Sequence, residues 1–366
     1  MPLRKLLAAI VLFLATAAAA QSPQPVPQFR TVGDARQLFV NNHPFLILGG
    51  ELANSSSSSL RYMQPIWPRL KLLNLNTVLV PISWEMIEPE EGRFDFAVTD
   101  GLLEGARRNG LHIVALWFGS WKNSMSSYVP AWVKRDERRF PRAQAADGTT
   151  LEMLSAFSLA NEDADARAFA ALMRHLRQVD PQRTVLMVQV ENEIGMIPSA
   201  RDHSELSNAA FAKQVPTALV PKGKAGGTWA QVFGSDADER FMAWNDARYT
   251  ERVAAAGKAE YPLPMYVNAA LARRGALAGQ YPSGGPLPHL FDIWRAGAPS
   301  IDMLSPDIYF PNFVEWARKY AVPGNPLFVP EASRAGQEEE SSNAFFAFGA
   351  LNAIGFSPFS IDSIST

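Results

Sequence analysis

The chain has 366 residues, a formal net charge of -2, no cysteine, and a hydrophobic fraction of 47%. Charges of both signs are mixed without a basic stripe, which argues against a nucleic-acid partner. The lack of cysteine excludes a disulfide scaffold, thiol catalysis and cysteine-based metal sites.

The first element along the chain is a targeting segment. A short basic start and an apolar run over residues 6–14 lead to small residues before Gln21. Because the run is too short to cross a bilayer, residues 1–20 are predicted to be a secretory signal peptide of a secreted or periplasmic protein. An uncleaved N-terminal anchor is the alternative. Residues 21–44 are predicted to form an N-terminal leader, and no later segment is apolar enough to span a membrane.

From residue 45 the chain alternates apolar runs with helical stretches. Strands that are buried on both faces of a parallel sheet form nearly continuous apolar runs. Eight such runs are predicted to be strands: Phe45–Leu48, Thr77–Val80, Leu111–Trp117, Val185–Val190, Met265–Asn268, Met303–Tyr309, Leu327–Val329 and Phe356–Ser360. The pattern predicts an α/β fold, a (β/α)₈ TIM barrel over 45–366. An open doubly wound sheet is less favoured, since no Gly-rich phosphate turn follows the first strand.

Helical spacing separates several of these strands. Phe169, Leu172, Met173 and Leu176 repeat at helical intervals, and a partly helical excursion is expected over about 200–258. A long loop from about 118 to 161 is expected before the first of these. Because the chain stops just beyond the eighth strand, we expect a barrel truncated after that strand, without its C-terminal helix or an accessory domain.

The active site of such a barrel lies at the C-terminal ends of its strands. The polar and aromatic residues at these ends are Glu51, Trp84, Glu85, Trp117, Asn192, Glu193, Asn268, Asp307, Tyr309 and Glu331. Glu193 and Glu331 each follow a strongly apolar run. Two carboxyl groups across a barrel mouth suit glycosidic cleavage, in which one gives a proton and the other attacks the anomeric carbon. A single strand-end glutamate is more often a solvated loop charge or a helix-capping partner.

The residues around Glu193 resemble a known family. The segment Val188–Gly195 resembles the acid/base segment of glycoside hydrolase family 35, the β-galactosidases, and Gly49–Glu51 resembles that family's first strand end. Residues 84–96 and Val129–Trp132 resemble the segments after its second and third strands. Beyond residue 200 the resemblance rests on the segment Pro330-Glu331.

This resemblance implies a division of roles. Glu193 would be the acid/base, Glu331 the nucleophile and Tyr309 its support, and Asn192 would contact the sugar 2-hydroxyl. The implied substrate is a terminal β-galactoside, cleaved with retention by an exo-acting enzyme that uses no metal and no other cofactor.

Further substrate contacts are expected from the remaining strand-end residues Glu51, Glu85, Asn268 and Asp307. Trp84 and Trp117 are expected to face the sugar pocket, with barrel packing as the alternative. The expected partner is a carbohydrate, and the sequence does not predict an oligomeric state. The alternatives are a β-glucosidase or an endo-glycanase of the same clan, and a non-catalytic carbohydrate-binding barrel.

Overall fold

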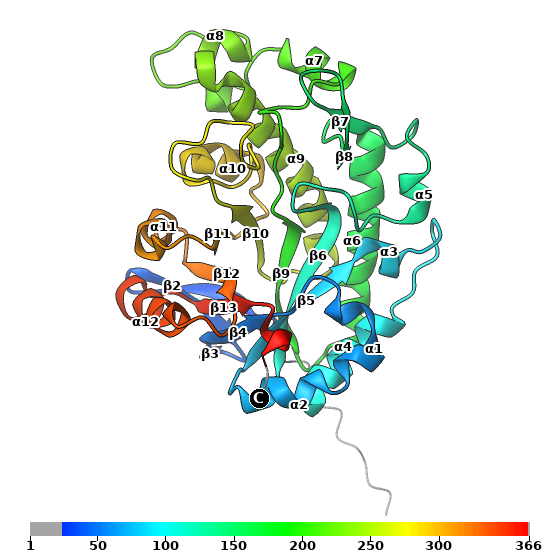
Figure 1. The fold of residues 1–366 in the computed structure, drawn as a ribbon, viewed down its shortest axis with the longest axis vertical. Coiled ribbons are helices and arrows are strands. Elements are labelled where there is room, and N and C mark those ends of the chain that lie inside the picture. The colour runs from blue at the N-terminus through cyan, green and yellow to red at the C-terminus, as the bar shows by residue number, and fades with distance from the viewer. Residues whose placement is uncertain (1–23, 365–366) are drawn as a thin grey trace, which may run out of the picture.

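The computed structural model describes residues 24–364, so the predicted signal peptide lies outside the described residues. Eight parallel strands close into a barrel (Figure 1). In chain order they are β4 (Ile47–Glu51), β5 (Thr77–Ser83), β6 (His112–Lys122), β9 (Val185–Asn192), β10 (Met265–Ala270), β11 (Met303–Ile308), β12 (Phe328–Arg334) and β13 (Gly355–Phe359). Each predicted strand corresponds to one of these, so the predicted barrel is confirmed.

Helices surround the barrel (Figure 1). They are α1 (Leu60–Met63), α2 (Ile66–Leu72), α3 (Trp84–Ile87), α4 (Ala97–Arg108), α5 (Ala131–Lys134), α6 (Leu159–Val179), α7 (Glu205–Phe211), α8 (Trp229–Phe233), α9 (Ala237–Glu260), α10 (Phe291–Gly297), α11 (Phe313–Tyr320) and α12 (Glu339–Leu351). The residues of the predicted helical repeat lie in α6, and α9 occupies the end of the predicted excursion. Within residues 24–364, no helix combines the length and the apolar character that crossing a membrane requires.

The loop after β6 is more structured than the sequence predicted. It contains a two-stranded antiparallel sheet of β7 (Arg142–Gln144) and β8 (Thr150–Leu154). β6 itself continues five residues beyond the predicted end at Trp117, with an irregular register against β9 between Trp117 and Lys122. This extension carries polar residues to the mouth of the barrel.

The described part of the predicted leader is folded. An antiparallel sheet of β1 (Gln28–Val32), β2 (Ala35–Val40) and β3 (His43–Pro44) precedes the barrel. Leu38 and Val40 from β2 are buried in one apolar cluster with residues from the starts of the barrel strands, including Leu79, Leu186 and Phe328. This sheet therefore contributes to the apolar layer at the N-terminal end of the barrel.

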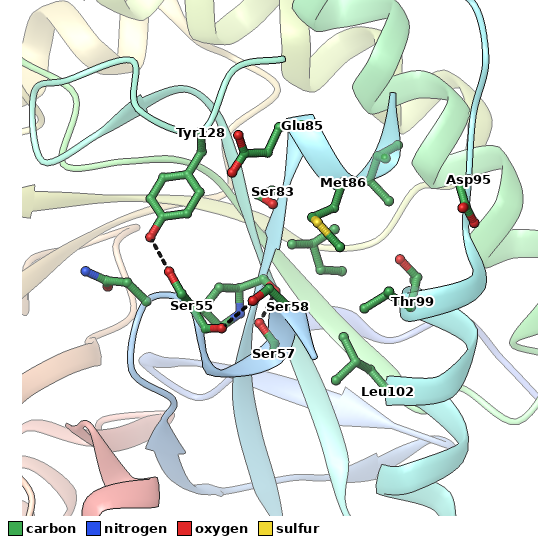
Figure 2. A pocket seen from close by; sticks show the side chains of 15 residues that line it. Ser55, Ser57, Ser58, Ser83, Glu85, Met86, Asp95, Thr99, Leu102 and Tyr128 are labelled. Atoms are coloured by element: carbon green, nitrogen blue, oxygen red, sulfur yellow. Dashed lines mark hydrogen bonds between the residues drawn. The ribbon is translucent and has the colours of Figure 1, made fainter. Parts of the chain in front are cut away.

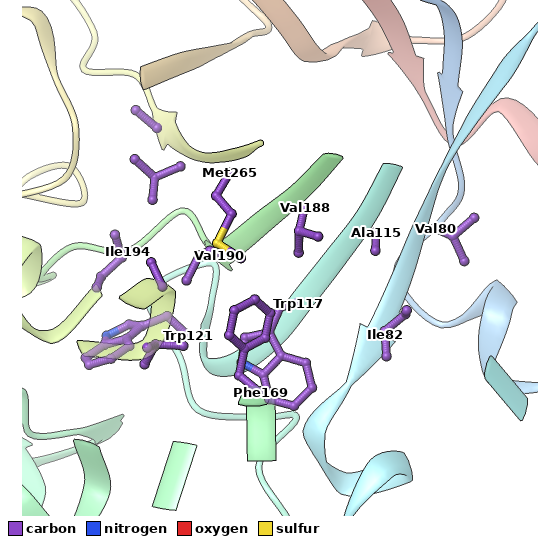
Figure 3. Packing of buried hydrophobic residues seen from close by; sticks show 14 of the residues in the cluster. Val80, Ile82, Ala115, Trp117, Trp121, Phe169, Val188, Val190, Ile194 and Met265 are labelled. Atoms are coloured by element: carbon purple, nitrogen blue, oxygen red, sulfur yellow. The ribbon is translucent and has the colours of Figure 1, made fainter. Parts of the chain in front are cut away.

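A second apolar cluster fills the space between the barrel and its helices. The Trp117 ring on β6 packs against Phe169 on α6, with the ring centroids 5.5 Å apart. Figure 3 shows both rings beside Val188 and Val190 of β9. This packing fixes β6 and β9, the strands that lead to the candidate site, against α6.

Two glycines at the end of β4 allow neighbouring segments to approach closely. A Cβ atom on Gly49 would lie 2.2 Å from Ser357 Oγ, and one on Gly50 would lie 2.5 Å from Ile361 Cγ1. The glycine pair therefore lets β4 pack against β13 and the segment that follows it, and this contact places Glu51.

We expect Leu38→Ala to test whether the N-terminal sheet stabilises the barrel. Leu38 is fully buried, so its truncation should lower the free energy of unfolding by about 2–5 kcal/mol. Val32→Ala in the neighbouring strand β1 is the matched control because Val32 is 48% exposed, and it should cost less than about 0.5 kcal/mol. Chemical denaturation measures both, and equal losses would show that the sheet is not part of the core.

Candidate active site

Four buried carboxyl groups meet at the C-terminal ends of the barrel strands. Glu51 ends β4, Glu193 follows β9, Asp307 lies on β11 and Glu331 lies on β12, and each is at most 6% exposed. One carboxyl oxygen from each of Glu193, Asp307 and Glu331 lies within 4.8 Å of the other two. The structure thus brings together the two glutamates that the sequence singled out.

The backbone around Glu193 is held in an uncommon conformation. Glu191 and Glu193 have φ values of +60° and +47°, a left-handed region in which a non-glycine residue costs roughly 1–3 kcal/mol. The Glu193 amide donates a hydrogen bond to Asn268 Oδ1 at 3.0 Å, and Asn268 Nδ2 donates to Asp307 Oδ2 at 2.6 Å. Asn268 therefore ties the strained segment to the neighbouring strands.

Glu193 has an elevated pKa. Burial of the carboxyl group and the nearby Glu331 carboxylate raise the pKa of Glu193 to about 7, while Lys122, Asp307 and Asn123 act in the opposite direction. The Asn123 amide donates a hydrogen bond to Glu193 Oε2. Glu193 can consequently exchange a proton near neutral pH, as a general acid/base must.

Glu51 and Asp307 lie beside Glu193 and Glu331, and both have elevated pKa values. Burial and the neighbouring Glu331 and Glu193 carboxyls raise the pKa of Glu51 and the pKa of Asp307 well above their usual values. Like charges this close cannot all ionise in a buried site. Protonated Glu51 can donate to Glu331, and protonated Asp307 can donate to Glu193.

Glu331 has one oriented oxygen and one free oxygen. The Tyr309 hydroxyl donates a hydrogen bond to Glu331 Oε1. Burial and the adjacent Glu331 carboxylate raise the pKa of Tyr309, so the phenol keeps its proton. Glu331 Oε2 is buried and accepts no hydrogen bond from an amide, hydroxyl or ammonium group of the described residues, which leaves it available to a reacting atom.

Two residues of the site were missed by the sequence analysis. Lys122 Nζ donates to Asn192 Oδ1 at 2.9 Å, and Asn123 bonds Glu193. Both lie where β6 ends, beyond the predicted strand end at Trp117. A lysine and an asparagine soon after an apolar run were a usable signal, but the irregular register between β6 and β9 does not follow from residue pattern.

A third pair of buried acids lies behind the site. Glu191 Oε2 accepts a hydrogen bond from the Trp121 amide at 2.7 Å, and Asp165 accepts from Ser120 and Trp117. Burial and Asp165 raise the pKa of Glu191 well above its usual value. Glu191 thus fixes the backbone of β6 and does not join the four carboxyls at the mouth.

The two strand-end tryptophans are packed rather than open. Trp84 and Trp117 are fully buried, and their indole nitrogens donate to Glu88 and Asp165 at 2.9 Å. Neither ring face is open to a sugar in this structure, which corrects the expectation of a pocket role. Tryptophan at a strand end does not reveal from sequence alone whether its side chain faces the mouth or the helices.

Glu85 lines a neighbouring cavity rather than the carboxyl cluster. This cavity of about 160 Å³ lies between the Ser-rich turn after β4, helix α4 and Tyr128 (Figure 2). Ser55 Oγ and the Tyr128 hydroxyl are 2.8 Å apart, and Lys134 Nζ lies 3.3 Å from Glu85 Oε2. Of the predicted contact residues, Glu85 is therefore separate from the cluster, whereas Glu51, Asn192, Asn268, Asp307 and Tyr309 belong to it.

The carboxyl cluster also has a spacing that could hold a metal ion. One carboxyl oxygen from each of Glu193, Asp307 and Glu331 lies within 4.8 Å of the other two. An acidic glycosidase site has the same composition without a metal, and the sequence-based expectation of a metal-free and cofactor-free site stays a prediction.

Replacement of Asn123 should change the titration of Glu193. A hydrogen bond donated to a carboxylate stabilises its ionised form, so Asn123→Ala should raise the pKa of Glu193 further above its value of about 7. NMR titration of glutamate-labelled protein measures this, with Asn245→Ala on α9 as the control. An unchanged or lower pKa in Asn123→Ala would contradict the geometry.

Comparison of the sequence with known proteins identifies a family. A family model described as β-galactosidase, glycoside hydrolase family 42, matches residues 61–258, more than half of the chain. A β-galactosidase from Xanthomonas manihotis is 29% identical over 220 residues, which cover 56% of this chain and 33% of that protein. The chain thus spans about a third of the length of this curated relative.

Solved structures share the fold. The β-galactosidase from Rahnella sp. R3 has a TM-score of 0.61 and 16% identity, over 86% of this chain and 50% of that chain. The β-galactosidase from Bacillus circulans sp. alkalophilus has a TM-score of 0.60 and 14% identity, over 86% and 50% of the two chains. This chain therefore spans about half the length of these structures.

The comparisons correct one expectation. The sequence motifs suggested family 35, whereas the matching family model is that of family 42. The wider prediction of a β-galactosidase family built on a barrel holds, because both the family match and the fold agree with it. The chain belongs to glycoside hydrolase family 42, whose model is described as β-galactosidase.

Proposed function

We propose that this chain carries the active site of a retaining β-galactosidase that removes terminal β-galactosyl residues from oligosaccharides or polysaccharides. Glu193 is the acid/base and Glu331 the nucleophile in this proposal. The observation that carries it is the approach of their carboxyl oxygens to within 4.8 Å.

The separation of the carboxyl groups bears on the stereochemistry. Retaining enzymes hold their carboxyl groups about 5–5.5 Å apart, whereas inverting enzymes need roughly 6.5–9.5 Å to admit a water molecule. The nearest oxygen atoms of Glu193 and Glu331 lie within 4.8 Å of each other, which is compatible with the shorter separation. This spacing is compatible with double displacement, the course that the proposal adopts.

The chemistry follows from the two environments. Glu331 Oε2 attacks the anomeric carbon and forms a glycosyl ester, while the glycosidic C–O bond breaks and the proton of Glu193 passes to the leaving oxygen. Water then attacks the same carbon, gives a proton to Glu193, and breaks the ester bond, which restores the Glu331 carboxylate. Glu193 and Glu331 are 6% and 4% exposed, so both groups react in a largely desolvated site.

The galactoside substrate is supported by the family and by the relatives' names, and the chain's own contacts are compatible with a sugar. Asn192 and Asn268 place amide groups beside the carboxyls. A β-glucosidase or an endo-glycanase would use the same carboxyl pair, and hydrolysis of a panel of aryl β-glycosides with product analysis separates these alternatives from an exo-galactosidase.

Export is part of the proposal. The signal peptide over residues 1–20 makes the protein secreted or periplasmic, and N-terminal sequencing of the protein from the extracellular or periplasmic fraction tests it. A mature chain that begins at Gln21 is expected, and a retained Met1 in the cytoplasm would overturn this part.

The proposal predicts how activity depends on pH. Glu193 must be protonated to act as the acid, so kcat/KM for an aryl β-galactoside should fall as the pH rises through about 7, the pKa of Glu193. Asn123→Ala should move this alkaline limb to higher pH. A rate that stays constant well above this pH would contradict the role of Glu193.

Azide rescue distinguishes the two glutamates. Glu331→Gly should lose activity on an aryl β-galactoside almost completely and regain it with azide as an α-galactosyl azide, because azide attacks in place of the missing nucleophile. Glu193→Ala should yield the β-galactosyl azide, because azide attacks the galactosyl ester of Glu331 in place of water and needs no general base to remove a proton. Swapped products would reverse the two roles.

A substitution of an exposed glutamate is the control for the Glu331 and Glu193 variants. Glu104→Gln on α4 removes an exposed carboxylate that pairs with Arg108, and it should leave activity unchanged. If the wild-type chain binds galactosides but hydrolyses no glycoside of the panel, the non-catalytic binding barrel replaces the enzyme.

A further inference from the structure

A tight turn over residues 122–125, at the end of β6, contacts Asn192 and Glu193. Lys122 and Met125 exchange backbone hydrogen bonds of 2.8 and 3.1 Å, and Asn123 and Ser124 adopt φ values of +53° and +57°. The first three residues contact the last residue of β9 or the residue after it: Lys122 bonds Asn192, Asn123 bonds Glu193, and Ser124 Oγ donates to the Glu193 carbonyl at 3.3 Å.

The contact with Asn192 determines which way its amide points. The Lys122 ammonium group can only donate hydrogen bonds, and its 2.9 Å contact therefore requires Oδ1 of Asn192. Asn192 is 1% exposed, and its Nδ2 is buried without a partner among the described residues. The amide thus keeps an unused donor in the buried site.

The lysine is itself buried and faces the acids. Lys122 is 5% exposed, and its Nζ lies 5.2 Å from the centre of the Phe118 ring. Its charge lowers the pKa of Glu51, of Glu193 and of Asp307 against the effect of burial. The group that orients Asn192 is therefore also a positive charge acting on the carboxyl cluster.

We propose that Lys122 is a positioning residue: it locks the Asn192 amide so that Nδ2 donates a hydrogen bond to the substrate hydroxyl oxygen next to the reacting carbon, the 2-hydroxyl of the galactosyl residue. This inference rests on the proposed function and deepens it. Without Lys122, the amide can rotate and offer its oxygen instead, and the donor is lost.

A pair of substrates isolates this role. Lys122→Met keeps the length of the side chain but removes its donors, so it should lower kcat/KM for an aryl β-galactoside by roughly 2- to 10-fold, the value of a neutral hydrogen bond from the Asn192 amide to the substrate hydroxyl. The penalty for the 2-deoxy analogue should be several-fold smaller, because that substrate lacks the hydroxyl. Lys122→Arg retains a charged donor and should restore much of the difference.

The pH profile supplies a readout that a purely structural role would not move. Loss of the Lys122 charge removes a force that lowers the pKa of Glu193, so the alkaline limb of Lys122→Met should shift to higher pH with both substrates. Lys71→Met on α2 replaces an exposed lysine and should change neither the substrate ratio nor the limb. Equal penalties on both substrates in Lys122→Met would overturn the proposal.

Binding without turnover separates this inference from the proposed function. Calorimetry should show that the wild type binds galactose more tightly than 2-deoxygalactose, and that Lys122→Met removes the difference. If this holds in a chain that hydrolyses nothing, the enzyme proposal fails while the role of Lys122 stands. If the wild type hydrolyses galactosides and Lys122→Met preserves the difference in affinity, only the role of Lys122 fails.

Discussion

Four carboxyl groups and one ammonium group share the buried mouth of the barrel, and electrostatics allows only some of these acids to be charged. The acids of the site differ in how strongly they hold their protons. Glu51 and Asp307 are the groups whose pKa values lie well above the usual range, whereas Glu193 has a pKa of about 7. Protonated flanking acids let the carboxyl groups of Glu193 and Glu331 lie close together without full mutual repulsion. In the proposed mechanism, one of these two groups then gives a proton and the other attacks as the nucleophile.

The scaffold around the site holds this arrangement in place. Glu193 occupies a left-handed backbone conformation, whose cost of roughly 1–3 kcal/mol must be offset by surrounding contacts. Asn268 on one side and the Lys122–Met125 turn on the other supply them. Behind the site, Glu191 and Asp165 bind the backbone of β6. The position of Glu193 therefore depends on contacts from β6, β9, β10 and β11 rather than on any single loop.

Much of the framework was predictable because parallel barrel strands are buried on both faces and form apolar runs. Glu193 and Glu331 could be found for the same reason, since each directly follows such a run. Lys122 and Asn123 could not, because the irregularity that extends β6 beyond Trp117 changes which residues reach the mouth. The orientation of Trp84 and Trp117, and the folding of the leader into β1–β3, depend on contacts between distant segments, which composition and periodicity do not encode.

The proposed mechanism requires Glu331 to react as a nucleophile at short range from Glu193. The anomeric configuration of the first sugar released by the wild-type chain from an aryl β-galactoside, followed by proton NMR before mutarotation, tests this most directly. With retention, β-galactose appears first and the α-anomer only later. Initial release of α-galactose would show inversion through an intervening water and would contradict the proposed chemistry.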